Sequence, residues 1–142
     1  MPHVSLITLG VDDLARSTTF YRALGWRVSS TSVEGVVAFL LGGAVPLGLF
    51  PRDALAAEAN VAVAANGMNT ACAFAMNLPS PAEVDEMCTR VETAGGTITA
   101  PPSVADWGGY SAYVRDPDNH LWEIVHNPGF ELDSDGRVAL PE

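Results

Sequence analysis

A chain of 142 residues, 48% of them hydrophobic, is long and apolar enough for one globular domain with a sizeable core. Its formal net charge of −10 makes nucleic acid and anionic membranes poor partners. No apolar run reaches the length of a membrane span, and the N-terminus lacks a secretory signal pattern. We therefore expect a cytoplasmic protein that binds neither nucleic acid nor a membrane.

The residue inventory removes several kinds of chemistry. All seven basic residues are Arg, so the chain offers neither a lysine for a Schiff base nor a phosphate-binding P-loop. Three His and two Cys leave few donors for a transition-metal site. Cys72 and Cys88 also lack metal-ligand spacing, and we expect both to be buried free thiols.

The first half of the chain predicts one strand, one helix and three further strands. Residues 4–11 form an apolar run bounded by turn-forming residues, which is typical of a strand. Asp12 or Asp13 can cap a helix that ends near Ala23, before Gly25. The three short strands are expected at about 27–31, 36–41 and 47–50.

The second half repeats this order after an Ala-rich connector. The connector spans 51–68, and Pro51 can begin a short helix in it. Ser80 and Pro81 begin the second long helix, which ends at Gly95. The strands are expected at 69–78, 97–100, 110–115 and 120–126, and the tail 129–142 as loop. A single domain over 1–142 results, with one module at about 4–50, the linker 51–68 and a second module at about 69–128.

Residues 110–128 predict two strands joined by a turn at Asp116-Pro117-Asp118-Asn119. Successive side chains on a strand point to opposite faces, so an alternation is expected after the turn. Leu121, Glu123 and Val125 share one face, and His120, Trp122, Ile124 and His126 share the other. The series His-x-x-Glu-x-x-His therefore cannot converge on one metal ion.

Two stretches resemble a known family. LITLGVDDLARSTTFYRALGW (6–26) and WGGYSAYVRDPDNHLWEIVHNPGF (107–130) resemble the first strand and helix and the closing hairpin of the vicinal oxygen chelate superfamily, the glyoxalase/bleomycin resistance/dioxygenase group. The resemblance covers about 4–130. It implies an α+β fold of two βαβββ modules that form a curled, cup-shaped mixed sheet with helices on the outer face. The family's habit also implies a homodimer.

The same resemblance gives an expectation about metal. Metal-using members place ligands on the first and last strands of each half, and the last-strand Glu corresponds to Glu123. The first-strand His corresponds to Leu6, and the positions in the other half fall near 73–74 and 47–49, where no donor side chain stands. Because one carboxylate alone does not hold a divalent ion tightly, we expect no metal and no cofactor.

Without a metal, the concave face would be an apolar cup that suits a small apolar or aromatic molecule. The loop from Trp107 to Tyr110 is the most ligand-like segment, because two rings flank a flexible glycine pair. The expected ligand-binding residues are Leu6, Thr8, Phe39, Leu49, Phe74, Met76, Trp107, Tyr110 and Glu123.

Glu123 admits two interpretations, and they lead to two function classes. As a catalytic acid or base it would need a raised pKa; as a structural group it would bond to Tyr110, Thr8 or backbone donors. The first class is a glyoxalase/bleomycin-resistance-like protein that binds a small molecule without metal. The alternative is an enzyme of the lyase, isomerase or dioxygenase type that uses Glu123 as acid/base or as a metal ligand.

Overall fold

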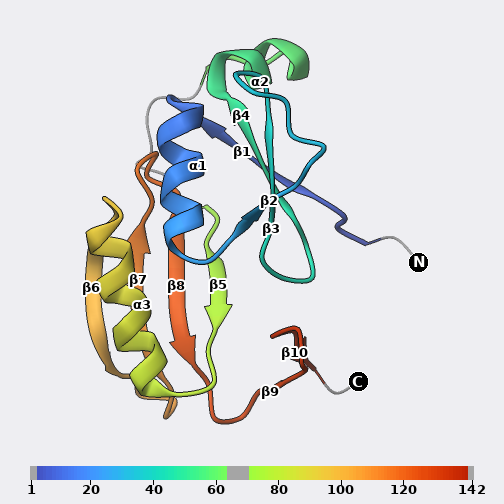
Figure 1. Ribbon diagram of the computed structural model, residues 1–142. Coiled ribbons are helices and arrows are strands. Elements are labelled where there is room, and N and C mark those ends of the chain that lie inside the picture. Colours follow the sequence, from blue (N-terminus) through green and yellow to red (C-terminus); the bar gives the residue numbers. More distant parts are fainter. Residues whose placement is uncertain (1–2, 64–70, 141–142) are drawn as a thin grey trace.

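The computed structural model describes residues 3–63 and 71–140, in two modules of similar order (Figure 1). The first module contains β1 (Ile7–Val11), α1 (Leu14–Ala23), β2 (Arg27–Val28), β3 (Ala38–Leu41), β4 (Leu47–Pro51) and α2 (Arg52–Ala59). The second contains β5 (Phe74–Asn77), α3 (Pro81–Thr93), β6 (Thr97–Val104), β7 (Tyr110–Arg115), β8 (Leu121–His126), β9 (Glu131–Leu132) and β10 (Val138–Ala139). No helix in the described ranges is long and apolar enough to cross a membrane.

Each module builds a mixed four-stranded sheet. The N-terminal sheet has the order β1-β4-β3-β2, and the C-terminal sheet has the order β5-β8-β7-β6. The pairs β1–β4 and β5–β8 are parallel, and the remaining pairs in both sheets are antiparallel. The predicted α+β class and the two βαβββ modules are confirmed.

The helices begin and end where local chemistry favours it. Asp13 accepts a hydrogen bond from the backbone N of Arg16 at 2.9 Å, which caps α1. Ser80 accepts from the backbone N of Glu83 and donates to its carboxylate, a capping box with Pro81 in the first turn of α3. Gly25 follows α1 with φ 106°, a left-handed conformation that glycine adopts without strain.

The structure corrects several predicted boundaries. The predicted strand at 97–100 extends to Val104, whereas the short helix predicted in the connector is confirmed as α2. The tail, predicted as loop, forms the β9–β10 hairpin, in which the Asp133 carboxylate accepts from the backbone N atoms of Asp135 and Arg137. Strands of two residues carry no periodicity, so the sequence pattern could not reveal them. The strand predicted at 69–78 is shorter than expected, because β5 spans Phe74–Asn77 and residues 71–73 are not in a strand; residues 69 and 70 lie outside the described residues.

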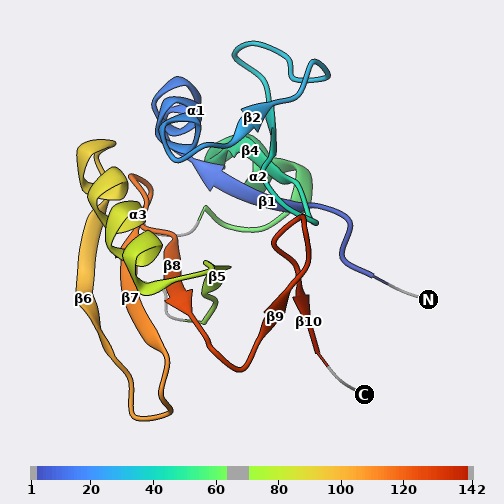
Figure 2. The same cartoon turned by 60° about the horizontal axis from the view of Figure 1, so that its bottom comes forward.

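One hydrophobic core serves both sheets. Leu9 and Leu49 of the N-terminal sheet, Trp122 and Ile124 of the C-terminal sheet, and Phe20 of α1 belong to the same buried cluster. Figures 1 and 2 show α1 and α3 on the sides of the sheets that face this core. The other side of each sheet, called here its outward face, points away from the core, so the two sheets do not close into one cup within the chain.

A buried hydrogen-bond network joins α1 to the turn between β7 and β8. Asp118, with a side chain 0% exposed, accepts from Ser17 Oγ at 2.5 Å, from the backbone N of Asp12 at 2.8 Å and from Arg16 Nη2 at 3.1 Å. Tyr21 donates its hydroxyl to Asp116 Oδ2 at 2.6 Å. Burial and then the charge of Asp116 raise the pKa of Tyr21 well above its usual range, so it remains a donor. The turn acids therefore join the two modules besides forming the turn.

Candidate functional site

Glu123 lies on β8 with the predicted alternation. Trp122 and Ile124 on either side of it are 6% and 1% exposed in the core, so the Glu123 side chain is on the outward face of the C-terminal sheet. Its direct neighbour on β7 is Tyr113. Burial, the charge of Glu123 and a hydrogen bond to Glu123 raise the pKa of Tyr113. Glu123 and Tyr113 are thus a carboxylate–phenol pair on a sheet face that none of the described helices covers.

The two partners expected for Glu123 lie elsewhere. Tyr110 is on the opposite face of β7, where its hydroxyl donates to Asp85 Oδ1 of α3 at 2.8 Å. That bond is also the main reason why the pKa of Tyr110 is raised. Thr8 belongs to the N-terminal sheet, whose outward face points in a different direction. The expected bonds from Tyr110 and Thr8 to Glu123 are therefore not formed.

Three predicted residues do lie together, on the outward face of the N-terminal sheet. They surround Gly48, because a Cβ placed there would lie 3.2 Å from Thr8 Oγ1 and 3.8 Å from Leu6 Cδ1 and Phe39 Cδ1. Leu49 was predicted to share this face, but it is 0% exposed and packs in the core on the other side of β4. Leu49 therefore does not line the predicted cup, since the strand alternates and its neighbour Gly48 occupies the outward side.

Trp107 lies in the connection between β6 and β7 and is 55% exposed. Its ring lies against Gly109, where a Cβ would come within 1.9 Å of the ring. Gly109 thus makes room for the tryptophan side chain. The nine predicted residues are spread over two outward faces, this loop, the core and the groove described next.

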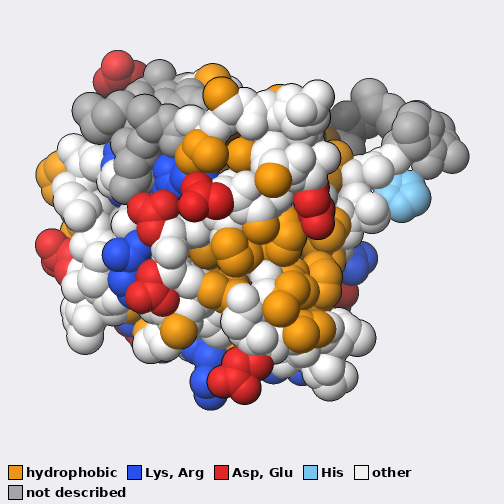
Figure 3. Space-filling model, turned by 90° about the horizontal axis from the view of Figure 1, so that it is seen from above, with side chains coloured by type: hydrophobic (Ala, Val, Ile, Leu, Met, Phe, Trp, Pro, Cys, Tyr) orange, Lys and Arg blue, Asp and Glu red, His pale blue; other side chains and the backbone are white. Residues whose placement is uncertain are grey.

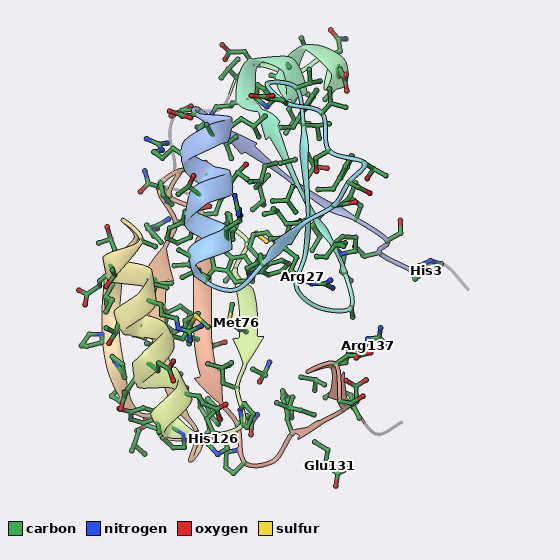
Figure 4. The ribbon with its side chains drawn as sticks, viewed as in Figure 1. His3, Arg27, Met76, His126, Glu131 and Arg137 are labelled. Atoms are coloured by element: carbon green, nitrogen blue, oxygen red, sulfur yellow. The ribbon has the colours of Figure 1, made fainter. Side chains whose placement is uncertain are left out.

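Phe74 and Met76 line a solvent-open groove of about 980 Å³ between the two sheets and the β9–β10 hairpin. Its floor is aromatic: the Trp122 ring centroid is 6.2 Å from that of Trp26 and 5.2 Å from that of Phe74. Figure 4 shows Met76 on β5 and Arg137 on the hairpin, two elements that border this aromatic groove. Sequence reasoning missed Trp26 and the hairpin side of the groove, because both depend on how the modules pack.

The residues around Glu123 do not fit a divalent ion. Leu6 stands where a His would be needed, and the near neighbour of Glu123 is a phenol. Within 3–63 and 71–140, no group of three or more His, Cys, Asp or Glu side chains could hold a metal ion. Of the two thiols, Cys88 is buried as expected, whereas Cys72 is exposed, contrary to expectation. We derive no chemical step through a metal.

A titration can test the pairing of Tyr113 with Glu123. Glu123→Gln removes the negative charge, so the pKa of Tyr113 is expected to fall toward 10 while that of Tyr110 stays unchanged. Asp85→Asn should lower the pKa of Tyr110 and leave that of Tyr113 unchanged. The measurement is a pH titration of the ring resonances by NMR. If the pKa of Tyr113 is the same in Glu123→Gln as in the wild type, the two side chains do not form a pair.

Comparisons with known proteins agree on one group. A family model described as Glyoxalase/Bleomycin resistance protein/Dioxygenase superfamily matches residues 2–124. The structure of a glyoxalase-related enzyme from Fulvimarina pelagi is 31% identical over 100% of both chains, with a TM-score of 0.90. A glyoxalase/bleomycin resistance protein/dioxygenase from Nocardioides is 26% identical over 94% of this chain and 91% of its own, with a TM-score of 0.72. Lactoylglutathione lyase from Agrobacterium tumefaciens is 25% identical over 90% of this chain and 97% of its own, with a TM-score of 0.66. No curated protein matches the chain.

Proposed function

This chain belongs to the Glyoxalase/Bleomycin resistance protein/Dioxygenase superfamily, and we propose that it binds a small, largely apolar or aromatic molecule in the aromatic groove. Membership confirms the resemblance carried by residues 6–26 and 107–130. The observation that carries the proposal is the groove itself, with Trp26, Phe74 and Trp122 side by side in its floor.

The size and lining of the aromatic groove support this function. Its volume of about 980 Å³ is at the upper end of the range typical for small-molecule sites, roughly 300–1,000 Å³. Aromatic rings offer a flat ligand both buried area and stacking, worth about 0.5–1.5 kcal/mol for a ring pair beyond area burial. Leu47 and Met76 add apolar surface beside the rings. The proposed binding needs no metal.

Tryptophan fluorescence and calorimetry together test the proposal. Quinoline, a flat aromatic that is uncharged at neutral pH, is expected to bind and to change the emission of Trp26 and Trp122. The change should persist in Trp107→Phe, because Trp107 does not line the groove. If calorimetry detects no binding of quinoline up to millimolar concentration, the proposed function fails. A signal lost in Trp107→Phe would instead place the ligand at the β6–β7 loop.

A second candidate function is an enzyme with Glu123 as acid/base. It is favoured by one observation, that Glu123 and Tyr113 are direct neighbours on adjacent strands and that the charge of Glu123 raises the pKa of Tyr113. A lyase, isomerase or dioxygenase type of reaction is possible in this family, and one similar structure is named a lactoylglutathione lyase. Glu123→Gln keeps the shape of the side chain but removes its proton-carrying group. If Glu123→Gln turns over a substrate of the wild-type protein at an unchanged rate, Glu123 is not the catalytic acid/base.

We also propose that the protein is a homodimer. Both outward faces carry exposed hydrophobic side chains, among them Leu6 at 40% and Leu41 at 38% on the N-terminal sheet. Figure 3 shows hydrophobic side chains gathered on the surface at the α2 end of the molecule as well. A second copy could place the face around Gly48 opposite Glu123 and so build the closed cup that one chain lacks. Equilibrium sedimentation tests this, and a monomer at all concentrations would contradict it.

A further inference from the structure

The aromatic groove has a polar side that the rings do not explain. The β9–β10 hairpin contributes Asp133, Asp135 and Arg137 to its lining. Arg137 Nη2 lies 3.6 Å from Asp135 Oδ2, and its charge also acts on the Asp133 carboxylate, so the charge of this cation is offset within the hairpin itself. The charged lining is therefore two carboxylates against one guanidinium, an excess of one negative charge beside three aromatic rings.

The Asp133 carboxylate is held in one orientation by the β9–β10 hairpin and carries a negative charge. One of its oxygens, Oδ1, accepts from the backbone N of Asp135 at 2.8 Å and from the backbone N of Arg137 at 2.9 Å. These bonds orient the carboxylate and lower its pKa, so it is anionic at neutral pH. The hairpin turn thus holds a negative charge at the edge of the aromatic floor.

Asp133 also lines a second, smaller space. A second hollow of about 330 Å³, lined in part by His126 and Phe130, shares Asp133 with the aromatic groove. Asn77, Leu78, Pro79 and Leu132 line both spaces too. Asp133 therefore borders both spaces, and a molecule in either of them would be exposed to the charge of its carboxylate.

The aromatic rings and the Asp133 carboxylate together favour a ligand with a positive charge. Aromatic faces attract cations through the ring quadrupole, and a nearby carboxylate adds a direct attraction. An anionic ligand would meet the Asp133 carboxylate and a chain with a net charge of −10. A neutral ligand would gain only the stacking and burial that the rings provide.

We propose that the aromatic groove selects flat, apolar molecules that carry a cationic group, with Asp133 as the specificity-determining counter-charge. The proposal rests on the proposed function, since it names the ligand class of the same groove. It adds a prediction that binding of an apolar molecule alone does not make: affinity depends on the charge of the ligand and on one acidic side chain of the hairpin.

Two probes of similar shape test the proposal by calorimetry. N-methylquinolinium carries a permanent positive charge, whereas quinoline is neutral at pH 7. The cation is expected to bind about 3- to 30-fold more tightly to the wild-type protein. In Asp133→Asn this preference should shrink at least threefold while quinoline affinity stays the same, because an asparagine side-chain oxygen can still accept the two backbone hydrogen bonds.

Asp106→Asn is the matched control. It removes the same charge from an exposed position in the β6–β7 connection and should leave the preference intact. Equal affinity for the two probes, or an equal loss of preference in both variants, would overturn the charge selection but not the proposed function. Absence of quinoline binding would overturn the proposed function itself. A circular dichroism spectrum of Asp133→Asn that matches the wild type excludes a hairpin-wide rearrangement as the cause.

Discussion

Asp118→Ala is expected to lower the free energy of unfolding by about 3–5 kcal/mol, because it removes the acceptor of a buried charged network and leaves its donors unpaired. Asp118 is buried, and it is bonded to Ser17, Arg16 and the backbone of Asp12, all from the other module. For a domain of this size the loss corresponds to a fall in Tm of roughly 10–15 °C. Urea denaturation followed by circular dichroism measures the free energy directly.

The control for Asp118 is another acidic residue with a close Arg partner. Glu86 Oε1 lies 2.8 Å from Arg90 Nη2 on the surface of α3, and both side chains are more than 45% exposed, at 62% and 48%. Glu86→Ala should cost less than about 0.5 kcal/mol, since exposed pairs one helical turn apart contribute little. Asp118→Asn, which retains one side-chain oxygen, should fall between the two. Equal losses for Asp118→Ala and Glu86→Ala would show that the network does not join the modules.

Phe74→Ala is expected to weaken the binding of quinoline by about 5- to 30-fold in Kd, the equivalent of about 1–2 kcal/mol for one lost stacking ring. Phe74 is half-buried on the edge strand β5, its ring is 5.2 Å from that of Trp122, and it lines the aromatic groove. Its position at an exposed edge limits the damage that the substitution does to the core. Calorimetric titration of the purified variant measures the change.

Phe39→Ala supplies the matched comparison. Phe39 is also half-buried on a strand, but it lies beside Gly48 on the outward face of the N-terminal sheet. Quinoline affinity should therefore remain within twofold of the wild type. If Phe39→Ala weakens binding and Phe74→Ala does not, the ligand occupies the outward face, and the cup predicted from the sequence is restored as the binding site.

Much of the fold could be predicted from residues that are close together in the sequence. Asp13 and Ser80 begin helices because their side chains accept bonds from the first free backbone N–H groups, and Gly25 ends one because it tolerates a positive φ. The side chains of Glu123 and Trp122 point to opposite faces of β8, because successive side chains alternate along any strand. Each of these relations involves residues a few positions apart, so composition and spacing are enough to predict them.

The location of the groove depended on contacts between residues about a hundred positions apart. Alternation groups residues by face, but which face becomes buried depends on how the helices and the two sheets pack, and Tyr21 and Ser17 of α1 bond across the modules to the turn at Asp116 and Asp118. In that packing Leu49 lies in the core and Trp26 lies beside Trp122. The sequence by itself thus determined the family, the two modules and the face on which Glu123 lies. The tertiary structure alone placed the aromatic groove, because burial is a property of the packed modules, and no local pattern records how they pack.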